Sequence, residues 1–301
     1  MSWPVLSPDR ESVLGRCPDP MRALADGEIG GVVIKGAYRP EDCAVLVRRF
    51  IAEDLIPDPA DPDRVFAGDY QTVGHFRSDD GANRPLRIDI GSSLVNHTRL
   101  NPDSGDKDAN KDRFLAHSEE TQALFARLFE GIADPVDCLY QTLSGLAPGK
   151  EVKTAYEPDG RGYGPAIFRV HYPGQAYTPH INHVRVGDRL DEFNVSRYAH
   201  QFAGLICFQH SADLETTPHA EVHRTEWTPE VRRHLTAGTY RDFLRDHAVP
   251  QCTIAVEPGD FYLFNSGLMH EVGPVVGDAA RIVLATFISY SPNDDEVMVW
   301  A

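Results

Sequence analysis

Two histidines, an asparagine and an arginine in the second half of the chain have the types and the order of an iron site. His180 and Asn182 stand two residues apart in the segment 168–182 (FRVHYPGQAYTPHIN), and His270 closes the segment 265–270 (NSGLMH). Residues two apart on a strand point to the same face. We therefore expect His180 and Asn182 to share one pocket, with His270 arriving from another strand end and Arg281 beginning a long strand eleven residues later.

This set of side chains indicates a particular chemistry. Two imidazoles and one side-chain oxygen suit a non-haem iron(II) ion that keeps positions open for other ligands. A guanidinium opposite the metal binds a carboxylate through two parallel hydrogen bonds. The sequence thus predicts a centre where iron chelates 2-oxoglutarate and reacts with O2. Each histidine alone is weak evidence, since a histidine on a strand is more often structural. The prediction depends on finding both histidines, the asparagine and the arginine together in this order.

The composition excludes several other classes of protein. Over 301 residues, 42% are hydrophobic and 25% are charged, as in an ordinary globular chain. The formal net charge of −16 repels phosphate backbones and anionic lipid, so we expect neither nucleic acid nor a membrane as a partner. The sequence lacks a run of the ~20 apolar residues that cross a bilayer and a secretory leader. We therefore expect a cytoplasmic enzyme acting on a small molecule.

The five cysteines do not suggest a disulfide framework or a thiolate metal site. They are odd in number and scattered, with no CxxC pair. We interpret them as small core residues.

The elements that position the site divide the chain into two halves. Before residue 150 the pattern is helical: 41–54 and 118–133 each carry one apolar stripe, and Ser118 with Glu119 and Glu120 suits a helix start. The polar stretch 101–113 (NPDSGDKDANKDR) is expected to be a surface loop. These helices should support one side of the protein. Their faces are also where a contact between two copies in a homodimer could form.

After residue 151 the pattern changes to short strands bounded by Gly, Pro, Asp or Ser. We expect strands at 166–172, 202–208, 220–225, 252–256, 260–265 and 281–290, with a helical excursion at 229–247. Many short strands after a run of helices favour an α+β fold in which an antiparallel barrel or jelly roll is backed by helices. We expect one domain over 1–301, with mainly helical support in 1–150 and a β-barrel core with the metal site in 151–301.

The chain resembles the iron(II)/2-oxoglutarate oxygenases, and among them it is most similar to the carrier-independent halogenases of the welwitindolinone and ambiguine type. The segments that carry the resemblance are 31–36 (GVVIKG), 142–147 (TLSGLA), 220–229 (AEVHRTEWTP) and 258–291 (PGDFYLFNSGLMHEVGPVVGDAARIVLATFISYS). The resemblance implies a double-stranded β-helix of the cupin-like kind. It also implies that His180 and His270 bind iron, that Arg281 holds the distal carboxylate of 2-oxoglutarate, and that Tyr172 is a further donor to this cosubstrate.

Asn182 departs from the pattern of the family that the chain resembles. The hydroxylases carry Asp or Glu two residues after the first histidine, and the halogenases carry Gly or Ala, which vacates a position for chloride. In one interpretation, Asn182 binds iron through its amide oxygen and takes part in catalysis by an oxygenase. In a second, Asn182 swings aside and donates its N–H2 group to chloride or water. In a third, His183 or a carboxylate from elsewhere in the chain completes the site. An aspartate deliberately replaced by asparagine would leave the same sequence.

Two further groups of polar residues are expected to have no direct role in the site. Arg169 and His171 alternate with Phe168, Val170 and Tyr172 along one strand, so we expect them to face away from the site if Tyr172 faces it. His210, His219 and His223 have no spacing that recurs as a ligand motif. We expect them to be surface or supporting residues.

Three functions follow, in order of preference. The first is oxidation of an unactivated C–H bond of a freestanding small molecule in specialised metabolism, by hydroxylation, desaturation or cyclisation, with 2-oxoglutarate converted to succinate. The alternative is halogenation by the same cofactors with chloride. The further alternative is a non-catalytic small-molecule-binding barrel, which has no need to retain both histidines and Arg281.

Overall fold

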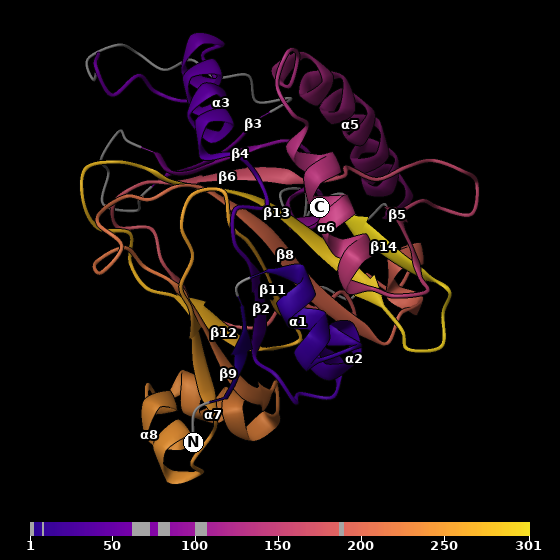
Figure 1. Cartoon of the computed structure of the whole chain (residues 1–301), viewed down its shortest axis with the longest axis vertical. Coiled ribbons are helices and arrows are strands. Elements are labelled where there is room, and N and C mark those ends of the chain that lie inside the picture. The colour runs from indigo at the N-terminus through magenta and orange to yellow at the C-terminus, as the bar shows by residue number, and fades with distance from the viewer. Residues whose placement is uncertain (1–2, 8, 62–72, 78–84, 100–106, 187–189) are drawn as a thin grey trace.

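The computed structural model describes residues 3–7, 9–61, 73–77, 85–99, 107–186 and 190–301 as two facing β-sheets with helices on the outside (Figure 1). The larger sheet has ten strands, in the order β1-β2-β11-β8-β13-β6-β4-β3, with β14 beside β13 and β5 beside β14. The smaller sheet has the order β10-β9-β12-β7. Pairing is antiparallel except between β1 and β2 and between β14 and β5. The α+β class is thus confirmed.

The large sheet uses segments from the whole length of the chain. Its strands are β1 Val5–Leu6, β2 Gly31–Ile34, β3 Val73–Arg77, β4 Pro85–Ile90, β5 Glu151–Thr154, β6 Ile167–His171, β8 His200–Gln209, β11 Phe261–Asn265, β13 Arg281–Tyr290 and β14 Glu296–Trp300. The small sheet consists of β7 Tyr177–His180, β9 Ala220–Glu226, β10 Gln251–Ile254 and β12 Leu268–Val272. Sequence order and spatial order therefore differ throughout.

The helices lie mainly before residue 150. They are α1 Arg10–Arg16, α2 Pro20–Ala25, α3 Pro40–Ala52, α4 Leu94–Arg99, α5 Lys107–Leu128, α6 Pro135–Leu146, α7 Pro229–Thr236 and α8 Tyr240–Asp246, with one 3-10 turn at Asn194–Arg197. Several begin in the way their sequences predict. Asp134 at the start of α6 accepts from the amides of Val136 and Asp137, and Pro135 takes the first position, where no amide hydrogen is needed.

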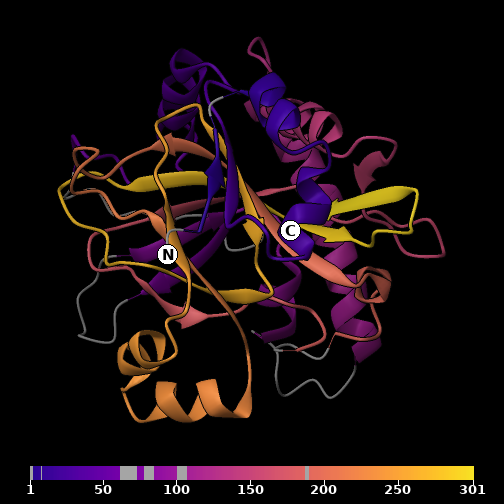
Figure 2. The same cartoon turned by 60° about the horizontal axis from the view of Figure 1, so that its bottom comes forward.

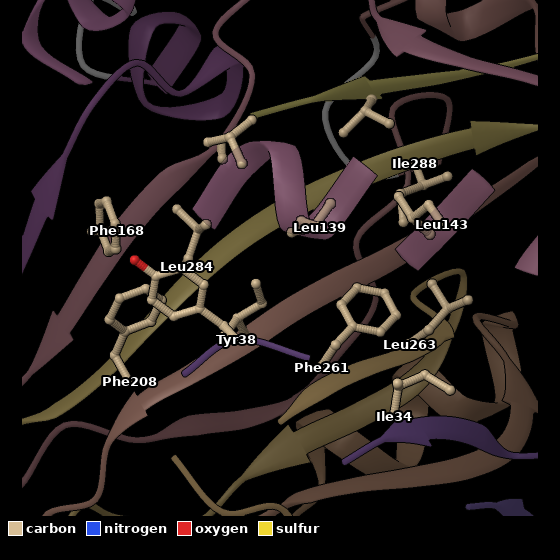
Figure 3. Close-up of a cluster of buried hydrophobic side chains, with 14 of the residues drawn as sticks. Ile34, Tyr38, Leu139, Leu143, Phe168, Phe208, Phe261, Leu263, Leu284 and Ile288 are labelled. Atoms are coloured by element: carbon tan, nitrogen blue, oxygen red, sulfur yellow. The ribbon is translucent and has the colours of Figure 1, made fainter. Parts of the chain in front are cut away.

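The outer face of the large sheet packs against α3, α5 and α6. All ten residues of β13 are buried, as expected for a central strand covered on both faces. Phe168 of β6 contacts Phe50 of α3 at 4.8 Å and Phe125 of α5 at 5.6 Å between ring centroids. Leu139 and Leu143 of α6 belong to the same apolar cluster, which Figure 3 shows beside β13 and β8. This cluster buries the outer face of the large sheet beneath the helices.

The inner face of the large sheet turns towards the small sheet. Ala203 and Cys207 of β8 and Phe264 of β11 share an apolar cluster with Ala220 and Val222 of β9. This cluster lies on the opposite face from the one under α3 and α5, because side chains alternate along each strand. The space between the sheets is where the polar residues singled out above meet.

A helical excursion lies beside the small sheet at one end of the molecule (Figures 1 and 2). The Thr228 side chain caps α7 by accepting from the Val231 amide at 3.1 Å. Tyr240 and Phe243 of α8 bury their rings with Met269 of β12. The helices expected at 229–247 are therefore present as a pair, α7 and α8.

The expected strands and the helix at 41–54 agree with the structure to within two residues at each end, and β13 has the predicted bounds. The helix start at Ser118 is wrong. Helix α5 begins at Lys107, and Ser118 lies inside it with its hydroxyl bonded to the Phe114 carbonyl. The expected surface loop at 101–113 is wrong for 107–113, which form the first turns of α5, while 101–106 lie outside the described residues. A polar surface helix lacks the apolar stripe on which the prediction depended.

Residues 1–150 supply strands as well as helices. This half supplies β1, β2, β3 and β4 to the large sheet. The strands β2 and β4 flank the central strands and were missed because each is short, with four and six residues. In the part of the chain that the structure describes, no helix is long and apolar enough to cross a bilayer.

The turn between β10 and β11 gives a test of this architecture. Gly259 has a φ of +92°, and a Cβ added there would lie 2.3 Å from the Tyr38 carbonyl oxygen. Gly259→Ala should therefore lower the free energy of unfolding by at least about 3 kcal/mol, from left-handed strain and a backbone clash together. Denaturant unfolding measures this, with Gly238→Ala as the control. Gly238 has a φ of +70° with nothing within 4 Å, so it should lose only the ~1–2 kcal/mol of strain. Equal losses would contradict the close approach of Tyr38.

Candidate metal centre and cosubstrate pocket

A pocket between the two sheets brings together four of the residues predicted from the sequence. His180, Asn182, His270 and Arg281 all line it. Its wall is completed by Ile167, Arg169, His171, Tyr177, Ala203, Leu205, Ala220, Tyr262, Phe264, Val272, Val283, Ala285, Thr286, Phe287 and Ala301. The histidines come from the small sheet and the arginine from the large one. A ligand in this pocket would therefore touch both sheets.

The two histidines face each other across neighbouring strands. His270 of β12 pairs with His180 of β7 in the antiparallel register, and their ring centroids are 4.3 Å apart. Each ring is oriented by its own strand: Nδ1 of His180 bonds the Thr178 carbonyl at 2.7 Å, and Nδ1 of His270 bonds the Leu268 carbonyl at 2.8 Å. A carbonyl only accepts, so each Nδ1 carries the hydrogen. In the neutral rings, each Nε2 then offers a lone pair.

Burial keeps His270 in the neutral form that a metal requires. Loss of hydration, followed by the neighbouring His180, lowers the pKa of His270 to about 3. A neutral imidazole binds iron without first releasing a proton.

Asn182 completes a set of donors that converges on one point. Its Oδ1 lies 3.1 Å from Nε2 of His270. With Nδ1 of His270 already donating, Nε2 and the amide oxygen are two acceptors that face each other without a hydrogen between them. A cation between them would satisfy both, so the residues present fit an iron(II) ion.

Arg281 occupies the other end of the pocket. It is the first residue of β13, its side chain is buried, and it donates to the Tyr262 hydroxyl at 3.3 Å. Its strand neighbour is His171 of β6, whose Nε2 lies 2.9 Å from the Tyr177 hydroxyl. A buried guanidinium beside two hydroxyls and an imidazole is suited to a carboxylate.

The comparison with protein families decides where the chain belongs. The model of the family described as carrier-protein-independent halogenase WelO5 matches residues 104–301. These residues include all of β5 to β14 and every one of the four pocket residues above. The chain belongs to this family.

Membership of the WelO5 family confirms the resemblance stated from the sequence. The chain is an enzyme of the iron(II)/2-oxoglutarate oxygenase superfamily, and iron and 2-oxoglutarate are the cofactors of that superfamily. No curated protein matches the sequence closely enough to count as a relative.

Solved structures of oxygenases are similar to this WelO5-family chain at low identity. EctD from S. alaskensis, with 2-oxoglutarate and 5-hydroxyectoine, has a TM-score of 0.44 and 16% identity over 89% of this chain and 74% of its own. HygX from Streptomyces hygroscopicus, with nickel and 2-oxoglutarate, has a TM-score of 0.42 and 15% identity over 88% and 85%. An N-substituted L-amino acid dioxygenase from Burkholderia ambifaria AMMD has 0.41 and 14% over 72% and 87%. These likenesses are too distant to carry an argument about activity.

The orientation predicted for β6 is wrong in this member of the WelO5 family. Arg169 and His171 line the pocket, whereas Phe168 and Val170 belong to the outer cluster under the helices, and Tyr172 packs against that cluster. The alternation of side chains along β6 was predicted correctly, but the face that meets the pocket was not. Tyr172 therefore lies on the wrong face to be the cosubstrate donor that the resemblance implied. Its buried hydroxyl has no hydrogen-bond partner among the described residues.

Tyr177 is a pocket residue that the sequence analysis missed. Its hydroxyl contacts Nε2 of His171 and receives a hydrogen bond from Arg87 at 3.1 Å, while its ring stacks near His180 at 5.8 Å. The spacing gave no signal, because Tyr177 precedes His180 by three residues, and residues three apart on a regular strand point to opposite faces.

The supporting roles expected for His210 and His219 agree with their contacts, since they bond the carbonyls of Val256 and Leu214. His183, which the third interpretation offered as a residue that completes the site, lines a second cavity and not this pocket. His223 bonds Glu271 at 2.8 Å.

The ligand atoms of Glu221, His223 and Glu271 lie within 4.8 Å of one another, as in a metal site. Arg241 already pairs with Glu271 at 2.7 Å and lies 3.7 Å from Glu221. A guanidinium thus supplies the positive charge that this cluster needs.

Proposed function

We propose that the chain is an iron(II)/2-oxoglutarate-dependent halogenase that replaces an aliphatic hydrogen of a freestanding small molecule by chloride. The overall change balances as substrate, chloride, a proton, O2 and 2-oxoglutarate giving chlorinated product, succinate, CO2 and water. The family model supports this outcome, and it moves halogenation ahead of hydroxylation, the first preference from the sequence.

The observation that carries the proposal is the neutral amide beside the two histidines. Asn182 places an uncharged oxygen 3.1 Å from Nε2 of His270, where a hydroxylase would place a carboxylate. An amide supplies no negative charge, so the ion would keep the same charge deficit that Gly or Ala leaves in the halogenases that the chain resembles. A halide fills that deficit, and a turn of the amide offers its N–H2 group to the halide as a donor.

The residues of this chain bind and orient the reactants. His180 and His270 would hold iron through their Nε2 atoms, with their rings fixed by the Thr178 and Leu268 carbonyls. Arg281 would hold the distal carboxylate of 2-oxoglutarate from the opposite sheet. When bound, iron and 2-oxoglutarate supply the oxidation that removes hydrogen from the substrate. The apolar lining, including Phe264, Val272 and Phe287, would exclude water from the pocket.

Hydroxylation is the second candidate, and one observation favours it. The amide oxygen of Asn182 already points at His270, so it is placed to bind iron and occupy the position that chloride needs. In that case, hydroxylation, desaturation or cyclisation would follow. A non-catalytic barrel is disfavoured because the lone pairs of the histidines and a buried Arg281 are retained in one pocket.

The proposal also covers the fold, the domain organisation and the kind of substrate. The two facing sheets would be the halves of a double-stranded β-helix, as the resemblance implies. Residues 1–301 would act as one domain, since segments from both halves share the large sheet. The substrate would be a free small molecule rather than one tethered to a carrier, in keeping with the family description.

Substitution of Asn182 tests the proposal directly. Asn182→Gly removes the competing oxygen and should raise the ratio of chlorinated to hydroxylated product by about tenfold or more, since a direct ligand is lost. Asn182→Asp restores a carboxylate and should abolish chlorination. Mass spectrometry of products, with and without chloride, measures both effects in a panel of candidate substrates, and succinate release reports turnover in the same samples.

The opposite result would favour the second candidate. If Asn182→Asp keeps or raises hydroxylation and the unaltered protein forms no chlorinated product at saturating chloride, halogenation is wrong. If the unaltered protein binds neither iron(II) nor 2-oxoglutarate in anaerobic calorimetry, the chain is a binding barrel.

A further inference from the structure

Asn182 lies outside any strand, unlike the two histidines of the proposed metal site. It follows the end of β7 by two residues, and the pairing of β7 with β12 joins His180 to His270 without including it. A side chain on irregular backbone is held less precisely than one on a strand, unless other contacts fix it. The position of its amide oxygen, 3.1 Å from Nε2 of His270, therefore needs a cause of its own.

Ser266, in the turn between β11 and β12, bonds both polar groups of the Asn182 backbone. The Asn182 amide donates to the Ser266 carbonyl at 2.8 Å, and the Ser266 hydroxyl donates to the Asn182 carbonyl at 3.0 Å. These two bonds lie on either side of the Asn182 Cα atom, so they fix the point from which its side chain starts. The first bond joins two backbone groups, and only the second depends on the serine side chain.

Ser266 is itself held in place by the large sheet. Its side chain is fully buried, and its amide donates to the carbonyl of Gln201 on β8 at 3.1 Å. The Ser266 hydroxyl oxygen also lies 3.1 Å from this carbonyl, which already accepts from the amide. Because a hydroxyl has one hydrogen, the Asn182 carbonyl is the acceptor with more to gain from it. The side-chain oxygen of Gln201 accepts from the Val184 amide at 3.0 Å, which ties the segment after Asn182 to the same strand.

An effect of Ser266 on a bound metal must pass through Asn182. Ser266 is not among the residues that line the pocket between the sheets or the second cavity. A neutral amide oxygen is a weaker ligand for a divalent metal than a carboxylate. Its contribution therefore depends on how little freedom it must lose when it binds.

We propose that Ser266 is a positioning residue for Asn182, whose backbone it holds so that the amide oxygen reaches the metal. This inference rests on the proposed iron site and adds the residue that controls its neutral ligand. Without the hydroxyl, the Asn182 backbone would be held at one end only. The amide would then compete less well with chloride, so the ratio of chlorinated to hydroxylated product should rise.

A double-mutant cycle on iron(II) affinity, measured by anaerobic calorimetry, tests the proposal. Ser266→Ala should weaken iron(II) binding by about threefold to tenfold, the range that one hydrogen bond supplies. In protein that already carries Asn182→Gly, the same change should alter the affinity by less than about twofold, because no amide remains to be positioned. A merely structural role would give the same loss in both backgrounds.

Ser118→Ala is the matched control for the loss of a buried hydroxyl. Ser118 is also fully buried, and its hydroxyl donates to the Phe114 carbonyl at 2.8 Å inside α5. This variant should keep its iron(II) affinity within about twofold in both backgrounds. If Ser266→Ala does not fold by circular dichroism, Ser266→Cys replaces it in the cycle. A thiol is a weaker donor, so the affinity should fall in the same direction.

Two outcomes would overturn the role of Ser266 while the iron site stands. One is an unchanged iron(II) affinity when the hydroxyl is removed from otherwise unaltered protein. The other is an equal loss of affinity with and without the Asn182 amide. Failure of the unaltered protein to bind iron(II) would instead refute the proposed function itself.

Discussion

Replacing His270 by alanine should lower the affinity for iron(II) by at least about 100-fold and abolish succinate formation from 2-oxoglutarate. His270 is buried, and its Nε2 is one of the ligand atoms that converge with Asn182. Without this imidazole, the ion would lose a ligand in a pocket where water cannot readily replace it. Anaerobic calorimetry with iron(II) measures the affinity, and a succinate assay measures turnover.

His183→Ala is the matched control for this prediction. His183 lies three residues after His180, yet it lines the second cavity and not the pocket between the sheets. It should keep its iron affinity within about twofold, because no ligand is removed. A loss at His183 as large as that at His270 would mean that the ion sits on the other side of β7. Unchanged iron binding in His270→Ala would refute the metal site.

Replacing Phe168 by alanine should lower the free energy of unfolding by about 3–5 kcal/mol. Phe168 is fully buried and lies at the centre of an aromatic group, with Phe208 of β8 at 5.1 Å and Phe50 of α3 at 4.8 Å between centroids. Alanine would leave a cavity at the junction of the sheet and its helices, and the packed neighbours cannot close it. Denaturant-induced unfolding followed by circular dichroism measures the loss.

Leu214→Ala is the control for Phe168→Ala. The Leu214 side chain is 43% exposed, so its loss should change stability by no more than about 0.5 kcal/mol. A loss below about 1 kcal/mol at Phe168 would mean that the helices do not pack on the sheet as described.

The sequence predicts the central strands well and the edges poorly. Strand β13 is apolar at nearly every position and is buried throughout, so its pattern needs no knowledge of its partners. Strand β7 has four residues, one of them proline, and β14 lies beside β5, a strand more than a hundred residues earlier. Short strands are stabilised by their neighbours more than by their own residues, so local patterns do not reveal them.

The candidate site could likewise be predicted from the sequence only in part. Order and spacing were sufficient to bring His180, Asn182, His270 and Arg281 into one pocket. His180, His270 and Arg281 lie on strands, and Asn182 follows the end of β7 by two residues. Alternation along β6 showed which residues share a face, but both faces are buried, so it could not show which face meets the pocket. One further step was available: helices cover one face and demand apolar side chains there, which leaves Arg169 and His171 for the polar interior.

The connection between β12 and β13 has a consequence for recognising related chains. His270 and Arg281 belong to different sheets, and the residues 273–280 that join them are exposed except for Val275 and the half-buried Ala280. Each end is held by the register of its own strand and not by the length of this connection. Insertions or deletions there would alter the interval along the chain without moving either side chain. Searches that demand a constant interval between the histidine and the arginine would therefore overlook homologues whose pockets are the same.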